Sequence, residues 1–133
     1  MSPELNSVKK EYRSIVQEKS FALAVKMVKY CNGLRNSNVS FVILNQVLKS
    51  STSIGANVEE ALGAQSDKDF IAKLYIVRKE TRETIYWLRL ISECFVIERT
   101  NVVDLIDNAS EILRIVNSIF LTMKEKCEKN QKS

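Results

Sequence analysis

Histidine is absent from the 133-residue sequence, and proline and glycine are scarce, with one and three copies. Without histidine the chain lacks the commonest general base and the commonest metal ligand, and a di-iron bundle built on Glu-x-x-His pairs is excluded. So few helix breakers favour an all-helical protein. We therefore expect no metal and no other cofactor.

Long apolar runs are also missing. No stretch reaches the ~18 apolar residues of a transmembrane helix, and the opening segment MSPELNSVKKEYRS lacks the apolar core of a signal peptide. The three cysteines, Cys31, Cys94 and Cys127, have no CxxC spacing and fit a reducing compartment. These features predict a cytoplasmic protein without a membrane partner.

Catalytic motifs are absent as well. The sequence has no glycine-rich phosphate loop, and Ser51 and Ser53 have no basic partner of the kind that a nucleophile needs. Glu80 and Glu83 are interpreted as ion-pairing groups, because Lys79 lies four residues before Glu83 on a helical pattern. We expect that the protein is not an enzyme.

Hydrophobic periodicity dominates what is present. Apolar residues recur every three or four positions through four long segments that short polar turns connect, as amphipathic helices require. This pattern predicts an all-α protein, an up-down-up-down four-helix bundle that forms one domain over residues 1–133. The predicted helices span about residues 8–35, 39–62, 67–98 and 102–127.

Polar and glycine residues mark the predicted helix ends. Ser37 or Asn38 should cap the second helix, and Gly63 should end it in the C′ position. Ser66 should cap the third helix and Asn101 the fourth. The charged C-terminal tail is expected to fray.

Two apolar stripes run along the first predicted helix, whereas a helix in a monomeric bundle needs only one. One stripe consists of Leu23, Met27, Tyr30 and Leu34, and the other of Phe21, Val25, Val28 and Cys31. The third and fourth segments also carry second apolar lines. This two-sided hydrophobicity predicts that the bundle self-associates.

The segment KSSTSIGANVEEA, residues 49–61, combines small residues with a helical apolar pattern. We expect Ser51, Gly55 and Ala56 to line a close helix–helix contact. Gly55 costs ~1 kcal/mol relative to alanine inside a helix, and it makes a local kink plausible. The Asn57 side chain should satisfy backbone groups that such a kink frees.

Positive charge is concentrated in the first part of the chain. The net charge is +4 overall, and residues 1–50 carry eight Lys/Arg against three Glu. Such a surplus either marks a surface for a polyanion or is an ordinary solvated helix face. The candidate nucleic-acid-binding residues are Lys9, Lys10, Arg13, Lys19, Lys26, Lys29, Arg35 and Lys49.

Two segments resemble a known family, the small four-helix-bundle proteins encoded in intervening sequences of bacterial 23S ribosomal RNA genes. SSTSIGANVEEA is similar to the helix-2 signature of that family, which reads roughly Ser-Ile-Pro-Ser-Asn-Ile-Ala-Glu-Gly. DFIAKLYIVRKETRETIYWLRLI resembles a Phe-x-x-x-Leu segment followed by a Glu-Thr-x-Tyr-Trp-Leu run. The positions concerned are Ser53, Ile54, Gly55, Asn57, Val58, Glu60, Phe70, Leu74, Glu83, Thr84, Tyr86, Trp87 and Leu88.

The resemblance covers about residues 13–125 and has two departures: Gly55 replaces a usual Pro, and Ala61 replaces a usual Gly. It implies bundles assembled as homopentameric barrels, without enzymatic activity. A related branch, the accessory proteins of diversity-generating retroelements, implies nucleic acid and a reverse transcriptase as partners. Two functions follow as alternatives: a self-associating scaffold that binds RNA or DNA with little sequence preference, or an interaction module whose ligand is another protein.

Overall fold

The computed structural model describes residues 2–132, with the side chains of residues 4, 5, 8, 11, 13, 14 and 126–132 outside the description. Within this range the chain is helical and contains no strand. The elements are α1 (Pro3–Gly33), α2 (Phe41–Leu62), α3 (Asp67–Cys94), a short 3-10 helix η1 (Val96–Glu98) and α4 (Arg99–Lys132). The predicted all-α fold of four helices is confirmed.

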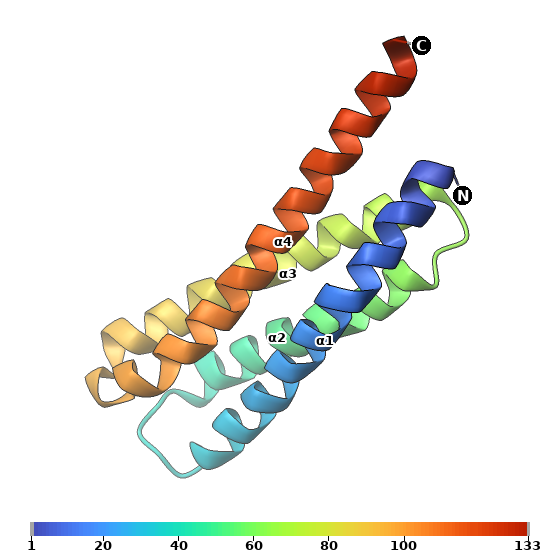
Figure 1. Ribbon diagram of the computed structural model, residues 1–133. Coiled ribbons are helices and arrows are strands. Elements are labelled where there is room, and N and C mark those ends of the chain that lie inside the picture. Colours follow the sequence, from blue (N-terminus) through green and yellow to red (C-terminus); the bar gives the residue numbers. More distant parts are fainter. Residues whose placement is uncertain (1, 133) are drawn as a thin grey trace.

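The four helices form an antiparallel bundle in which each helix packs against the next along the chain, and α4 closes against α1 (Figure 1). Both termini therefore lie at the same end, and the last turns of α4 extend past the bundle (Figure 1). Two faces lie opposite one another in this arrangement, one made by α1 and α2, the other by α3 and α4. None of the helices in the described range is both long and apolar enough to cross a membrane.

The core is built from the apolar positions that the periodicity predicts. Leu23 and Met27 of α1 are buried, whereas Phe21, Val25 and Val28 remain exposed on the same helix. One stripe of α1 therefore belongs to the core, and the other faces outward except at Cys31, which is buried. The buried stripes of α2, α3 and α4 complete the core with Ile54, Val58, Phe70, Leu74, Leu88, Ile91, Val102, Ala109 and Val116, among others.

Helix ends follow the sequence only in part. Ser66 caps α3 as predicted, because its Oγ accepts a hydrogen bond from the Asp69 backbone N–H at 3.1 Å. The predicted cap of α2 is wrong: the helix begins at Phe41 after Ser40. Ser37 instead closes the preceding turn, since its hydroxyl donates to the Leu34 carbonyl at 2.8 Å.

The other predicted ends also need correction. Gly63 does end α2, but its φ of −88° is not the left-handed conformation of a C′ glycine. Asn101 lies inside α4 and does not cap it, because η1 leads into that helix at Arg99. Its side-chain amide instead donates to the Glu98 carboxylate at 3.2 Å. α4 extends to Lys132, beyond its predicted end near residue 127.

Small residues allow α2 to approach its neighbours closely. A Cβ atom built on Gly55 would lie 3.7 Å from both the backbone oxygen and the Oγ of Ser20 in α1. Ser51 is buried as expected, whereas Ala56 is exposed and takes no part in this contact. The helix is continuous through this segment, and Asn57 Nδ2 donates to the Ser53 carbonyl at 2.9 Å.

Buried hydroxyl groups line the contact between α2 and α3. The Ser50 hydroxyl donates to its own helix at Val47 O, 3.3 Å away, and lies 2.9 Å from Thr84 Oγ1 across the interface. Thr81 donates to the Val77 carbonyl at 2.7 Å. Because each hydroxyl bonds within its own helix or to its partner, these polar groups are buried without loss of their hydrogen bonds.

Replacing Gly55 tests the close approach. Gly55→Ala should raise the free energy of unfolding by about 0.5–1 kcal/mol, because the added Cβ makes only ordinary contacts and alanine favours the helix. Gly55→Leu should lower it by about 1–3 kcal/mol, because the longer side chain overpacks the contact with Ser20. Urea denaturation followed by circular dichroism measures both, and a leucine variant as stable as the alanine variant would contradict the close-approach interpretation.

The two cysteines with described side chains should differ in reactivity. Cys31 is buried against α2, and burial raises the pKa of its thiol to about 11, whereas Cys94 is exposed. At about pH 8 the Cys31 thiol therefore stays protonated and inaccessible, and alkylation should modify Cys94 alone. Mass spectrometry of a Cys127→Ser variant reads this out, with Cys94→Ser added as the control. Rapid modification of Cys31 in the folded control would show that this end of the core opens.

Candidate functional site

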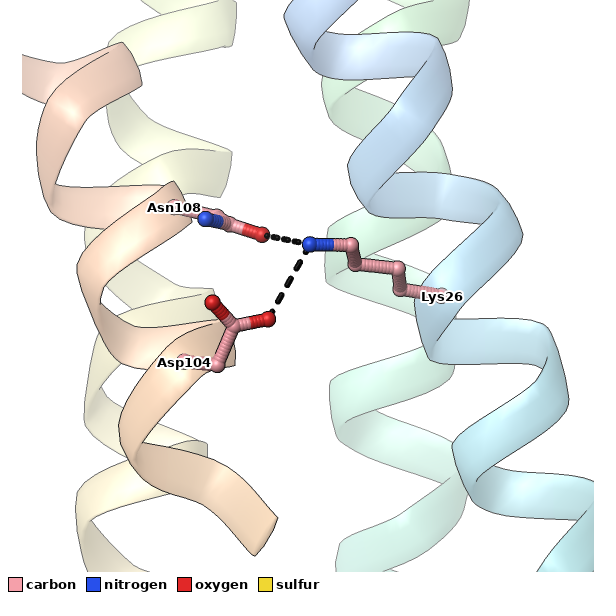
Figure 2. A network of polar contacts seen from close by, with 3 residues as sticks. All are labelled: Lys26, Asp104 and Asn108. Atoms are coloured by element: carbon pink, nitrogen blue, oxygen red, sulfur yellow. Dashed lines mark hydrogen bonds and ion pairs between the residues drawn. The ribbon is translucent and has the colours of Figure 1, made fainter.

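The basic residues predicted from α1 do not form one surface. Lys26 Nζ lies 3.0 Å from Asp104 Oδ2 and 2.8 Å from Asn108 Oδ1, both on α4 (Figure 2). Lys19 pairs with Glu111 of α4 at 2.8 Å, and this contact holds the pKa of the Glu111 carboxyl below its ordinary value. These two lysines connect α1 to α4. Their positions are therefore accounted for by contacts within the bundle and do not require a ligand.

The remaining candidates are dispersed. Lys9 donates to the Ala64 carbonyl at 3.4 Å, and the side chain of Arg13 lies outside the described residues. Lys10 and Lys29 are exposed, but 19 residues of helix place them about 28 Å apart along α1. The two others, Arg35 and Lys49, are exposed in the turn after α1 and on α2.

A second set of side chains, three arginines and two tyrosines that charge counting along the chain does not identify, lies on α3. Tyr75, Arg78, Arg82, Tyr86 and Arg89 follow one another at steps of three, four, four and three residues, which places them along one side of the helix. We call this set the α3 line. The signal in the sequence is the helical spacing of arginine and tyrosine, which lies within the segment that carries the family resemblance.

The α3 line borders a groove between α3 and α4. Two hollows of about 400 and 430 Å³ lie along it. The α3 line and apolar side chains of both helices line these hollows. The apolar residues are Ile71, Ile85, Leu90, Leu113, Phe120, Leu121 and Met123.

Aromatic contacts hold part of the α3 line in place. The guanidinium carbon of Arg78 lies 5.1 Å from the centre of the Tyr75 ring and 4.7 Å from that of Phe120. The Tyr75 and Phe120 rings are themselves 4.6 Å apart. Tyr86 contacts the edge of Trp87 with ring centres 5.0 Å apart. The line therefore presents preordered cationic and aromatic faces.

The groove is electropositive. Among the side chains that the structure describes, no carboxylate lies within ion-pair distance of Arg78, Arg82 or Arg89. Glu93, the one acidic residue that lines the hollows, lies 3.7 Å from the Arg99 guanidinium. The three arginines of the α3 line thus differ from Lys19 and Lys26, whose charges the bundle already neutralises.

Tyr12 and Tyr30 have raised pKa values, and both pack against other parts of the bundle. Tyr30 donates to Glu98 at 2.8 Å, and burial, reinforced by the Glu98 hydrogen bond and charge, raises the pKa of Tyr30 above its ordinary value. Burial also raises the pKa of Tyr12, whose hydroxyl finds no hydrogen-bond partner among the described residues. Tyr12 instead packs its ring edge-on against Phe70, with ring centres 5.9 Å apart.

No group of three or more metal-ligating side chains occurs in the described part of the chain. Burial, and then the neighbouring Glu83, raises the pKa of Glu80. The expected ion pair between Lys79 and Glu83 is not present among the described contacts.

Most of the motif residues fall into three groups. Six are in the core and stabilise the fold, and they are Ile54, Val58, Phe70, Leu74, Thr84 and Leu88. Gly55 and Asn57 serve the α1–α2 contact and the backbone of α2. Glu60, Glu83 and Tyr86 are exposed. Tyr86 is therefore the motif residue that also belongs to the α3 line.

Comparison with known proteins identifies the family. The model of the 23S rRNA-intervening sequence protein family matches residues 13–118. A protein of unknown function of the S23 ribosomal protein family, from Bacteroides thetaiotaomicron VPI-5482, has a crystal structure that superimposes with a TM-score of 0.76. It is 41% identical to this chain over 81% of this chain and 96% of its own length. No curated protein matches. The chain belongs to the 23S rRNA-intervening sequence protein family.

Proposed function

We propose that the protein is a cytoplasmic, non-enzymatic helical scaffold that self-associates and binds RNA or DNA with little sequence preference. The observation that carries this proposal is the outer surface of the bundle, which exposes apolar side chains in two separate places and cations in a third.

Self-association is supported by two different apolar surfaces that lie exposed on the bundle. Phe21, 70% exposed, projects from α1 together with Val25 and Val28, and we call these three residues the α1 ridge. Ile97, 87% exposed, lies with Val96 at the bundle end where α3 turns into α4. Two different exposed apolar surfaces favour head-to-tail contacts, which close into a ring when the rotation between copies permits. The family resemblance favours a ring of five.

Nucleic-acid binding is supported by charge. One chain carries a net charge of +4, so five copies carry about +20, and a ring presents each cationic site five times. Repetition converts weak single contacts into higher overall affinity, because after the first contact the others are intramolecular. Contacts of this kind address the phosphate backbone and therefore tolerate many sequences.

The alternative function is an interaction module for another protein, such as a reverse transcriptase. The exposed apolar residues at the bundle end, which include Phe41 and Ile97, favour it. The two functions differ in their response to salt, because only phosphate contacts release condensed counterions.

The assembly half of the proposal is tested by light scattering. The native protein should scatter as about 76 kDa, five times the 15.2 kDa of one chain. The double variant Phe21→Gln and Val28→Gln should scatter as smaller species, because it removes apolar area from the α1 ridge. The control is Ser118→Gln on the exposed face of α4, which should leave the mass unchanged. A native protein that scatters as a single chain would refute self-association.

The binding half is tested by fluorescence anisotropy with labelled oligonucleotides of unrelated sequences. Binding should be clear at about 50 mM salt and should fall by orders of magnitude toward about 200 mM. The sequences should differ little in affinity, because the contacts are to phosphates. An assembled ring that binds none of them at low salt would favour the protein-ligand alternative.

A further inference from the structure

We propose that a single-stranded nucleic acid lies along the α3 line, with its phosphates on the arginines and its bases against the tyrosine rings. The inference rests on the proposed function and deepens it, because it assigns the binding surface to the α3–α4 groove. The cations of α1, from which the sequence analysis expected the contacts, then have a secondary part.

The length and regularity of the α3 line suit an extended strand. From Tyr75 to Arg89 the helix rises about 21 Å, which is long enough for several nucleotides of a single strand. Its members keep to one side of α3 over this whole distance. Lys124 lines the groove from α4 and adds a further cation at one end.

Arg78 contacts the Tyr75 and Phe120 rings, but no carboxylate among the described side chains neutralises the charges of the α3 line. Lys19 and Lys26 pair with carboxylates of α4, whereas the arginines of the line have no such partner among the described side chains. A second copy that docked the apolar α1 ridge here would remove Arg82 and Arg89 from water without neutralising them, which is costly. Phosphate groups would neutralise them, and guanidinium matches phosphate geometry.

The aromatic members of the α3 line supply rings on which bases can stack. A single strand exposes its base faces, whereas a duplex buries them. Tyr86 is 58% exposed, and its edge contact with Trp87 limits its freedom. The Arg78 guanidinium is already held over the Tyr75 and Phe120 rings. Unpaired bases stack on such aromatic rings and guanidinium planes. A duplex buries its base faces in its own stack, so it can use only the cations of this surface.

The first experiment compares two variants that remove equal charge. Arg82→Gln with Arg89→Gln removes two cations from the α3 line, and Lys10→Gln with Lys29→Gln removes two from α1. All four side chains are exposed, so both variants should fold, as circular dichroism can verify. Binding of a labelled oligothymidylate of about 16 nucleotides is measured by anisotropy over a range of salt concentrations.

The arginine pair should lose affinity at least about tenfold at low salt, and its log–log salt dependence should become shallower by about 1.4, or ~0.7 for each lost contact. The lysine pair should keep most of the affinity and nearly all of the slope. If the lysine pair lost binding while the arginine pair retained it, the surface would lie on α1. That result would overturn this inference and leave the proposed function standing.

The second experiment separates stacking from general apolar contact. Tyr86→Phe keeps the ring and should bind oligothymidylate like the native protein, whereas Tyr86→Leu should weaken binding at least about fivefold. The affinity for a duplex of the same length should be lower and should not distinguish the two variants. Equal binding by the phenylalanine and leucine variants would overturn the stacking role.

Light scattering of the same variants tests whether a second copy of the chain, and not nucleic acid, occupies the α3–α4 groove. The arginine pair and Tyr86→Leu should retain the native mass, because the groove is not used between copies. Loss of the assembly in these variants would assign the groove to a second copy and overturn the inference. A native protein that binds no oligonucleotide would overturn both the inference and the proposed function.

Discussion

The close approach of α2 to its two neighbours is the constraint on which the rest of the structure depends. On one side Gly55 meets the backbone of α1 at Ser20, and on the other the Ser50 and Thr84 hydroxyls meet between α2 and α3. Larger side chains at these points would separate the helices and open the core that they enclose, at a cost that close-packed interiors do not absorb easily. The small residues of the motif thus serve packing.

Close packing on the inside determines what remains outside. Because α1 already contributes Leu23 and Met27 to the core, its second apolar stripe with Phe21 cannot also be buried in the same bundle. The α3 line is left outside in the same way, since the opposite side of α3 supplies Leu74, Leu88 and the other core residues. A narrow bundle made of two-sided helices therefore presents binding surfaces as a direct result of how it folds.

Among the described side chains, some cations form ion pairs within the bundle, and others remain unpaired on its surface. The lysines of α1 that point toward α4 bridge the two helices, and such exposed pairs add little to stability. These pairs also neutralise part of the surplus of positive charge in the first part of the chain. The arginines of the α3 line have no carboxylate partner among the described side chains and lie beside aromatic rings, a combination suited to phosphates and bases.

The sequence alone determined the fold class, the four helices, the buried stripe of α3 from Phe70 to Ile91 and the Ser66 cap, because these depend on periodicity and local hydrogen bonds. It also carried the family resemblance. Only the tertiary structure decided that Ser40 precedes α2, that Asn101 lies within α4, and that Lys26 faces Asp104 across 78 positions of chain. Charge counting along the chain pointed to α1, whereas the structure places on α3 a row of arginines that are unpaired among the described side chains. The physical reason is that a side chain's partners come from neighbouring helices, whose relative rotation no local pattern encodes.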